Sequence, residues 1–107
     1  MNPTISCNAL AEITTPQTIK IERHIKKKNV IVLIDSGSTH NFIHCKIAKE
    51  LNFFLYPAQE CQVMVANGRT INCSRKCHNI KLSMGEYVLY SPMISIPMGG
   101  VDVVLGV

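Results

Sequence analysis

The ten-residue stretch VIVLIDSGST, residues 30–39, sets the fold of this 107-residue chain. Its first five residues are Val, Ile or Leu, and so short an apolar run predicts a strand buried on both faces. The run ends abruptly at Asp35, and polar, turn-forming residues follow it. A carboxylate at such a boundary is held by a rigid strand and has the N–H groups of the turn within reach, so it can act as a general acid or base. The same residue types are also typical of an ordinary β-turn or helix cap, and the stretch alone leaves both interpretations open.

The flanking segments extend this strand into a hairpin and a helix. Upstream, apolar and polar residues alternate over residues 19–24, which predicts a half-buried strand. The polar run 26–29 predicts the turn that joins it to the buried strand. Downstream, Ile43, Ile47 and Leu51 recur at helical spacing, and we expect a helix over residues 41–51.

The second half of the chain predicts strands and turns. Asn67-Gly68 is a strong hairpin signal, because a type I′ turn needs positive φ at both central positions. Pro92 is expected to interrupt a strand. The expected strands cover residues 61–66, 69–73, 78–83, 86–90, 93–96 and 101–105. We therefore predict a mainly β fold, a closed barrel of about seven strands with one or two short helices.

The sequence pattern divides the chain into a leader and one domain. Residues 1–16 show no sustained periodicity and are expected to form a flexible leader, with one short strand near Ile5. Residues 17–107 are expected to form a single domain. The chain ends within an apolar run at Val107, so we expect the natural domain to continue and this chain to be truncated at its C-terminus.

Composition excludes several function classes. Hydrophobic residues make up 47% and charged residues 17%, which excludes a disordered chain. No apolar run approaches the roughly 20 residues of a membrane span, and no secretory signal is recognisable. Without such a signal, the five cysteines are expected to be reduced thiols rather than a disulfide framework. The net charge of +4 is concentrated in the lysine run 26–28, which predicts a solvated turn rather than a specific nucleic-acid surface.

Three segments carry a family resemblance. Residues 33–38, Leu-Ile-Asp-Ser-Gly-Ser, resemble the active-site signature of the aspartic proteases. The continuation 39–43 resembles the retropepsin-like proteases of gypsy-type long-terminal-repeat retrotransposon polyproteins. Residues 63–68 are similar to the flap hairpin of that family, and residues 101–106 to its late apolar-apolar-Gly motif. The resemblance covers about residues 18–107 and implies a retropepsin-like acid-protease barrel.

The resemblance also implies a mechanism. Because the chain carries one Asp-Ser-Gly motif, it implies a homodimer in which two copies of Asp35 form the dyad that activates water. Ser36 would brace the loop, and Gly37 would accept substrate backbone, with Ser38 completing the active-site loop. Ala66, Asn67 and Gly68 would form the flap tip over a peptide or polyprotein substrate. The resemblance implies no cofactor, metal or membrane partner, and it assigns no catalytic role to Asp102. It also implies a cytoplasmic, intracellular location, where the polyprotein would be processed.

Other interpretations stay open on the sequence alone. Cys73, Cys77 and His78 lie within six residues and are candidate zinc ligands, but no second paired cluster accompanies them. Cys45, beside His44, is a candidate nucleophile that lacks an orienting third group. A rival from a different class is a catalytically inactive relic, or a dimerisation or peptide-binding module on the same fold.

Overall fold

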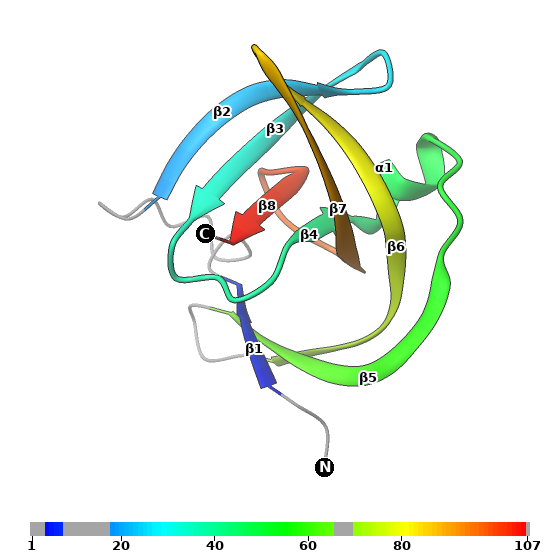
Figure 1. The fold of residues 1–107 in the computed structure, drawn as a ribbon. Helices are drawn as coiled ribbons and strands as arrows, with labels where there is room; N and C mark the ends of the chain where they lie inside the picture. The colour runs from blue at the N-terminus through cyan, green and yellow to red at the C-terminus, as the bar shows by residue number, and fades with distance from the viewer. Residues whose placement is uncertain (1–3, 8–17, 66–69, 107) are drawn as a thin grey trace.

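The computed structural model describes residues 4–7, 18–65 and 70–106, and these form eight strands and one short helix (Figure 1). In chain order the elements are β1 (Thr4–Cys7), β2 (Thr18–Ile25), β3 (Lys28–Asp35), β4 (Phe42–His44), α1 (Cys45–Glu50), β5 (Tyr56–Val65), β6 (Thr70–Met84), β7 (Tyr87–Ile96) and β8 (Val103–Gly106). The predicted mainly β class is confirmed. None of the helices within these ranges is long and apolar enough to cross a membrane.

The sheet closes on itself. Its strand order is β1-β5-β6-β2-β3-β8-β4-β7, and a further pairing of β6 with β7 joins the ends of the last six strands. β5 continues outward from β6, and β1 pairs with β5 in parallel. The predicted closed barrel is therefore present, with β5 and β1 added to its side (Figure 1). The strand expected near Ile5 is β1.

β8 is inserted between two strands that come much earlier in the chain. It runs parallel to β3 and antiparallel to β4. Asp102, just before β8, fixes this position: the Ile31 N–H donates to its Oδ2 at 2.8 Å, and its own N–H donates to the Ile31 carbonyl at 2.9 Å. The carbonyl of Asp102 in turn accepts the His44 N–H at 2.8 Å. These bonds join β3, β8 and β4 at one end and bring Gly106 beside Asp35 at the other.

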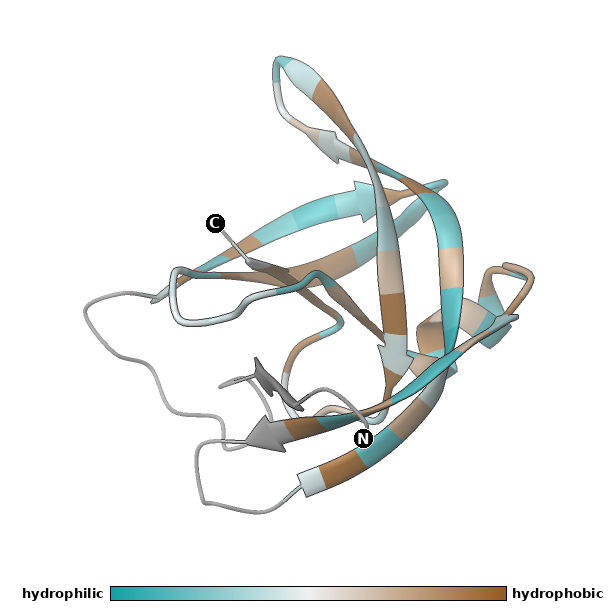
Figure 2. Cartoon of the chain, turned by 60° about the horizontal axis from the view of Figure 1, so that its bottom comes forward, coloured by the Kyte–Doolittle hydropathy of each residue, from teal (hydrophilic) through white to brown (hydrophobic). Residues whose placement is uncertain are grey.

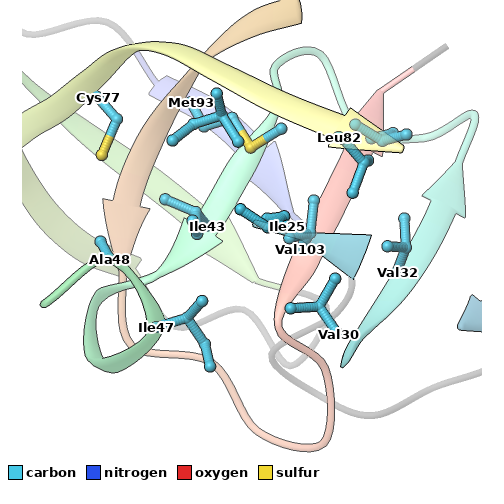
Figure 3. Packing of buried hydrophobic residues seen from close by; sticks show 12 residues of the cluster. Ile25, Val30, Val32, Ile43, Ile47, Ala48, Cys77, Leu82, Met93 and Val103 are labelled. Atoms are coloured by element: carbon cyan, nitrogen blue, oxygen red, sulfur yellow. The ribbon is translucent and has the colours of Figure 1, made fainter. Parts of the chain in front are cut away.

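Alternation along the strands builds the core. Figure 2 shows hydrophobic and hydrophilic bands succeeding one another along the long strands, as expected where one face of a sheet is buried. Figure 3 shows side chains from β2, β3, β4, α1, β6, β7 and β8 meeting inside the barrel, among them Ile25, Ile43 and Val103, which are fully buried. Each such burial stabilises the fold by about 1.5–3 kcal/mol.

The predicted helix over residues 41–51 is wrong in its first part. Phe42 and Ile43 point to opposite faces of β4, and both are completely buried. β4 pairs with β7 and β8, which gives both residues an apolar neighbourhood that a surface helix lacks. The helix is therefore confined to α1, and its apolar side consists of Ile47 and Ala48.

Two predicted interruptions are also absent. β6 is continuous through residues 74–77, and β7 runs through Pro92. The register of the β6–β7 pair shifts between Cys77 and Ile80, opposite Pro92. Because a bulge needs no ladder hydrogen bond at that position, it tolerates a residue without an N–H, and the strand continues.

Candidate active site

Asp35 is the last residue of β3, which lies between β2 and β8 in the sheet. Its backbone lies opposite Thr18 of β2 and Gly106 of β8. The residue is completely buried, whereas Ser36 and Gly37, which follow it, are exposed. The predicted boundary between a buried strand and a polar loop is therefore found where the sequence placed it.

The loop after β3 wraps around the Asp35 carboxylate. The Gly37 N–H donates to Oδ1 at 2.8 Å, and the Ser38 hydroxyl donates to Oδ2 at 2.8 Å. The Ser38 N–H closes the turn onto the Asp35 carbonyl at 3.1 Å. Hydrogen bonds to a carboxylate are stronger than those between neutral groups, so this pair fixes the orientation of both oxygens. Among the predicted loop residues, Gly37 and Ser38 thus contact the carboxylate.

Gly106 fits this loop because it has no side chain. A Cβ at this position would lie 2.5 Å from the Ser38 carbonyl oxygen and 3.0 Å from that of His40. Both are backbone atoms, which cannot rotate away. The late apolar-apolar-Gly segment therefore supports the back of the Asp35 loop at a distance that only glycine permits.

Asn41 links the loop to two further strands. Its Oδ1 accepts the Gly106 N–H of β8 at 2.8 Å, and its Nδ2 donates to the Ser91 hydroxyl of β7 at 2.6 Å. Its carbonyl accepts the Ile94 N–H at 3.0 Å. The sequence predicted Asn41 as the start of a helix and as part of the segment 39–43 that carries the family resemblance, without assigning it a contact, and it gave Ser91 no role. The signals available for Asn41 were this resemblance and its position directly after the Asp35 loop.

A cavity of about 470 Å³ lies beside the loop. Thr39, His40 and Gly106 line one side of it, and residues of β5, β6 and β7 line the rest. Asp35 does not line this cavity and has no exposed surface of its own. In the single chain, the carboxylate is therefore enclosed.

The predicted flap tip, Ala66, Asn67 and Gly68, lies outside the described residues. The arms on either side of it are described: β5 and β6 pair in antiparallel register as far as Met64 opposite Thr70.

The candidate zinc ligands do not gather. Cys73 and Cys77 are buried, whereas the His78 ring is exposed and stacks on Tyr56 with the ring centroids 3.6 Å apart. Across residues 4–7, 18–65 and 70–106, no group of three or more His, Cys, Asp or Glu side chains is placed to hold a metal ion.

The candidate nucleophile Cys45 is the first residue of α1. The Nδ1 atom of its neighbour His44 accepts the Lys46 N–H at 3.1 Å. By accepting this hydrogen bond, the His44 ring caps the N-terminus of α1. Among the described residues, this bond joins the ring to the helix backbone and not to the Cys45 thiol.

A closed mainly β barrel that presents an Asp-Ser-Gly loop at the end of an inner strand defines the acid-protease class of fold. A family model described as retroviral aspartyl protease matches residues 4–107, which is nearly the whole chain. The chain belongs to this family, and the predicted retropepsin-like resemblance is confirmed. No curated protein matches the chain.

Proposed function

We propose that the chain is an aspartic endopeptidase whose active site forms between two copies, each supplying Asp35. The observation that carries the proposal is the Asp35 carboxylate, held through both oxygens by Gly37 and Ser38 in a chain of the retroviral aspartyl protease family. Family membership supports aspartic-protease chemistry in general. The substrate we propose is a retrotransposon polyprotein of the gypsy type, processed in the cytoplasm.

The need for a second copy rests on the chain's other aspartate. The sequence contains two Asp residues, and the Asp102 carboxylate accepts the Ile31 N–H at the base of β8. It is thereby committed to holding the barrel together and does not lie in the Asp35 loop. A dyad therefore takes its second carboxylate from a partner's Asp-Ser-Gly loop, which a two-fold axis would place opposite the first.

In the proposed reaction the two carboxylates share one proton. Like charges so close cannot both ionise, a property for which aspartic proteases are the standard example. The ionised Asp35 takes a proton from water, which attacks the peptide carbonyl carbon. The protonated Asp35 of the partner subunit donates to the carbonyl oxygen, and a proton passes to the amine as the C–N bond breaks. Ser36 would brace the paired loops, and Gly37 would accept the peptide N–H.

The Asp35 carboxylate has to become accessible before it can act on a peptide. Ser36 and Gly37 are exposed, but the Asp35 carboxylate is not, so association of two copies must uncover it. Ala66, Asn67 and Gly68 are proposed to close over the peptide, which would bind as an added strand.

Cleavage of fluorogenic peptides at acidic pH tests the proposal. Asp35→Asn keeps the size of the side chain and removes its acid–base function, so we expect turnover to fall by a factor on the order of 10²–10⁴. Glu86→Gln makes the same chemical change at an exposed carboxylate and should leave turnover unchanged. Pepstatin should inhibit the wild type. Turnover that survives Asp35→Asn would refute the aspartic mechanism.

The complete burial of Asp35 favours one alternative: a peptide-binding or dimerisation module without catalysis. It predicts that fluorescently labelled peptides bind equally to wild type and Asp35→Asn and that neither is cleaved.

A further inference from the structure

Two buried thiols face each other across the hairpin formed by β5 and β6. Cys61 and Cys73 are directly opposite in the antiparallel register, and their Sγ atoms are 2.6 Å apart. Their side chains are only 8% and 7% exposed. Both thiols are free, so the pair is present in its reduced form.

The backbone at this pair already satisfies the requirements of a disulfide. Residues directly opposite in an antiparallel ladder have Cα atoms about 4.5–5.5 Å apart, within the range of about 4.4–6.8 Å that disulfides span. The two sulfurs also lie in mutual contact rather than pointing apart. Bond formation therefore requires small side-chain rotations and no change in strand pairing.

We propose that Cys61 and Cys73 form a reversible disulfide when the protein meets a peroxide, and that this bond locks the two arms of the β5–β6 hairpin together. The inference does not depend on peptidase activity, since it concerns two thiols that the proposed mechanism does not use. Cytosolic disulfides, where they occur, are usually transient and redox-sensing, which is the behaviour proposed here.

The chemistry balances with hydrogen peroxide as the oxidant. One thiolate attacks a peroxide oxygen, the O–O bond breaks, and a sulfenic acid and hydroxide result. The second sulfur then attacks the sulfenic sulfur, forming the S–S bond and expelling the hydroxyl. The proton lost by the first thiol combines with the hydroxide from the peroxide, and the proton of the second thiol combines with the expelled hydroxyl, so that two thiols and one peroxide become one disulfide and two waters.

The surroundings of Cys61 and Cys73 determine both the access of a peroxide to the pair and the rate of its oxidation. Cys61 and Cys73 line the cavity of about 470 Å³, which admits a molecule as small as a peroxide. Burial, and secondarily the neighbouring Cys61 thiol, raise the pKa of Cys73 to about 12. The Cys73 thiolate is therefore scarce at neutral pH, and we expect its oxidation to be slow there and faster in alkaline solution.

The position of the pair determines what the bond does. The β5–β6 register shifts between Pro57 and Cys61, and regular pairing resumes at the Cys61–Cys73 rung. A covalent link there ties the two arms immediately beyond the irregularity. Separation of the arms at this rung would then require the disulfide to break, and opening of the adjacent rungs from Gln62 to Met64 would be restricted.

Peptide mapping of the wild-type chain tests the bond directly. The chain is treated with hydrogen peroxide, blocked with N-ethylmaleimide and digested with trypsin without reductant. Cleavage after Lys49, Arg69 and Arg75 separates Cys61, in peptide 50–69, from Cys73, in peptide 70–75. We expect these two peptides to appear linked and to separate on reduction with dithiothreitol. Linkage to Cys77 or Cys45, linkage between chains, or unlinked peptides would overturn the proposal.

Variants identify the pair and its effect. Cys73→Ser should abolish the link, whereas Cys45→Ser, at a half-buried cysteine outside the hairpin, should preserve it. Peroxide should slow backbone amide exchange over residues 61–64 and 70–73 in wild type and Cys45→Ser, and dithiothreitol should reverse this. Unchanged amide exchange in a chain shown to be cross-linked would refute the locking effect. The mapping test uses the wild-type chain, so its result holds even if a variant fails to fold.

Discussion

The Asp35 carboxylate illustrates how much of the site is local. The Gly37 N–H and the Ser38 hydroxyl, which donate to its two oxygens, belong to residues two and three positions further along the chain. Short-range bonds of this kind follow from turn chemistry, in which Asp readily accepts from the backbone two residues on. For this reason the sequence alone could predict the polar turn that holds the Asp35 carboxylate.

Asn41, Ser91 and Gly106 could not be predicted in the same way. Asn41 bonds to Gly106 across 65 residues of sequence and to Ser91 across 50. No local pattern encodes such a meeting, because it depends on which strands the barrel brings together. The loop was therefore predictable from the sequence, and the support behind it was not.

Substitution of Gly106 tests that support. Gly106→Ala places a Cβ 2.5 Å from the Ser38 carbonyl oxygen, and we expect the free energy of unfolding to fall by about 1–3 kcal/mol as the loop is displaced. Urea denaturation followed by circular dichroism measures the change. Gly85→Ala is the matched control: its Cβ meets no atom within 4 Å, although its φ of +78° carries its own cost. A smaller loss for Gly106→Ala than for Gly85→Ala would contradict the assigned role.

Cys73 makes the fold sensitive to alkaline pH. Burial, and then the Cys61 thiol, raise the pKa of Cys73 from 9.0 to about 12 in the folded chain. Below pH 9 both states keep the proton and this contribution to stability is fully present. Between pH 9 and 12 the unfolded chain has lost the proton that the folded chain retains, so the free energy of unfolding falls as the pH rises.

By pH 10 the expected loss from Cys73 is roughly 1 kcal/mol. Urea denaturation of the wild type and of Cys73→Ala at pH 8 and pH 10, with a phosphine reductant present, measures it. The decline should be smaller in Cys73→Ala, which has no proton to lose at this position. Equal declines in the two chains would show that the thiol is not responsible.

Among the elements, the segment from Asn41 to Leu51 shows where periodicity misleads. Ile43, Ile47 and Leu51 have helical spacing, yet Ile43 belongs to β4 because tertiary pairing overrides the local pattern. Hairpin β2–β3 was predictable since its alternation, turn and buried run all agree. The continuity of β7 through Pro92 was not, since it depends on a bulge between two strands.

Asn41 joins the loop after β3 to β7 and β8, and its truncation should loosen all three together. Asn41→Ala leaves the Gly106 N–H without its acceptor, and we expect a loss of about 1–3 kcal/mol in the free energy of unfolding. Ser91→Ala removes only the hydroxyl that Asn41 Nδ2 contacts and should cost less. Amide exchange of Gly106 should accelerate in Asn41→Ala, and an exchange rate equal to that of Ser91→Ala would contradict the bond's assigned importance.

For the molecule as a whole, closure of the barrel explains why one chain is half of the proposed enzyme. Asp102 is held where β8 enters the sheet, and Asp35 stands where β3 and β8 end together. The two carboxylates thus occupy opposite ends of the same strand pairing. As long as this strand pairing is intact, the two carboxylates are held apart.

Mixing experiments test the resulting dependence on a second copy. If each site takes one Asp35 from each of two chains, an equal mixture of wild type and Asp35→Asn should retain about a quarter of the activity of the same total amount of wild type, because only wild-type pairs carry both carboxylates. Independent single-chain sites would retain half. Peptide hydrolysis at fixed total protein measures the ratio, and mixing wild type with Glu86→Gln should leave activity undiminished. Activity per chain should also rise with chain concentration, since dilution separates the pairs. Total activity that is strictly proportional to chain concentration, together with mixtures that retain half of the activity, would exclude the shared site.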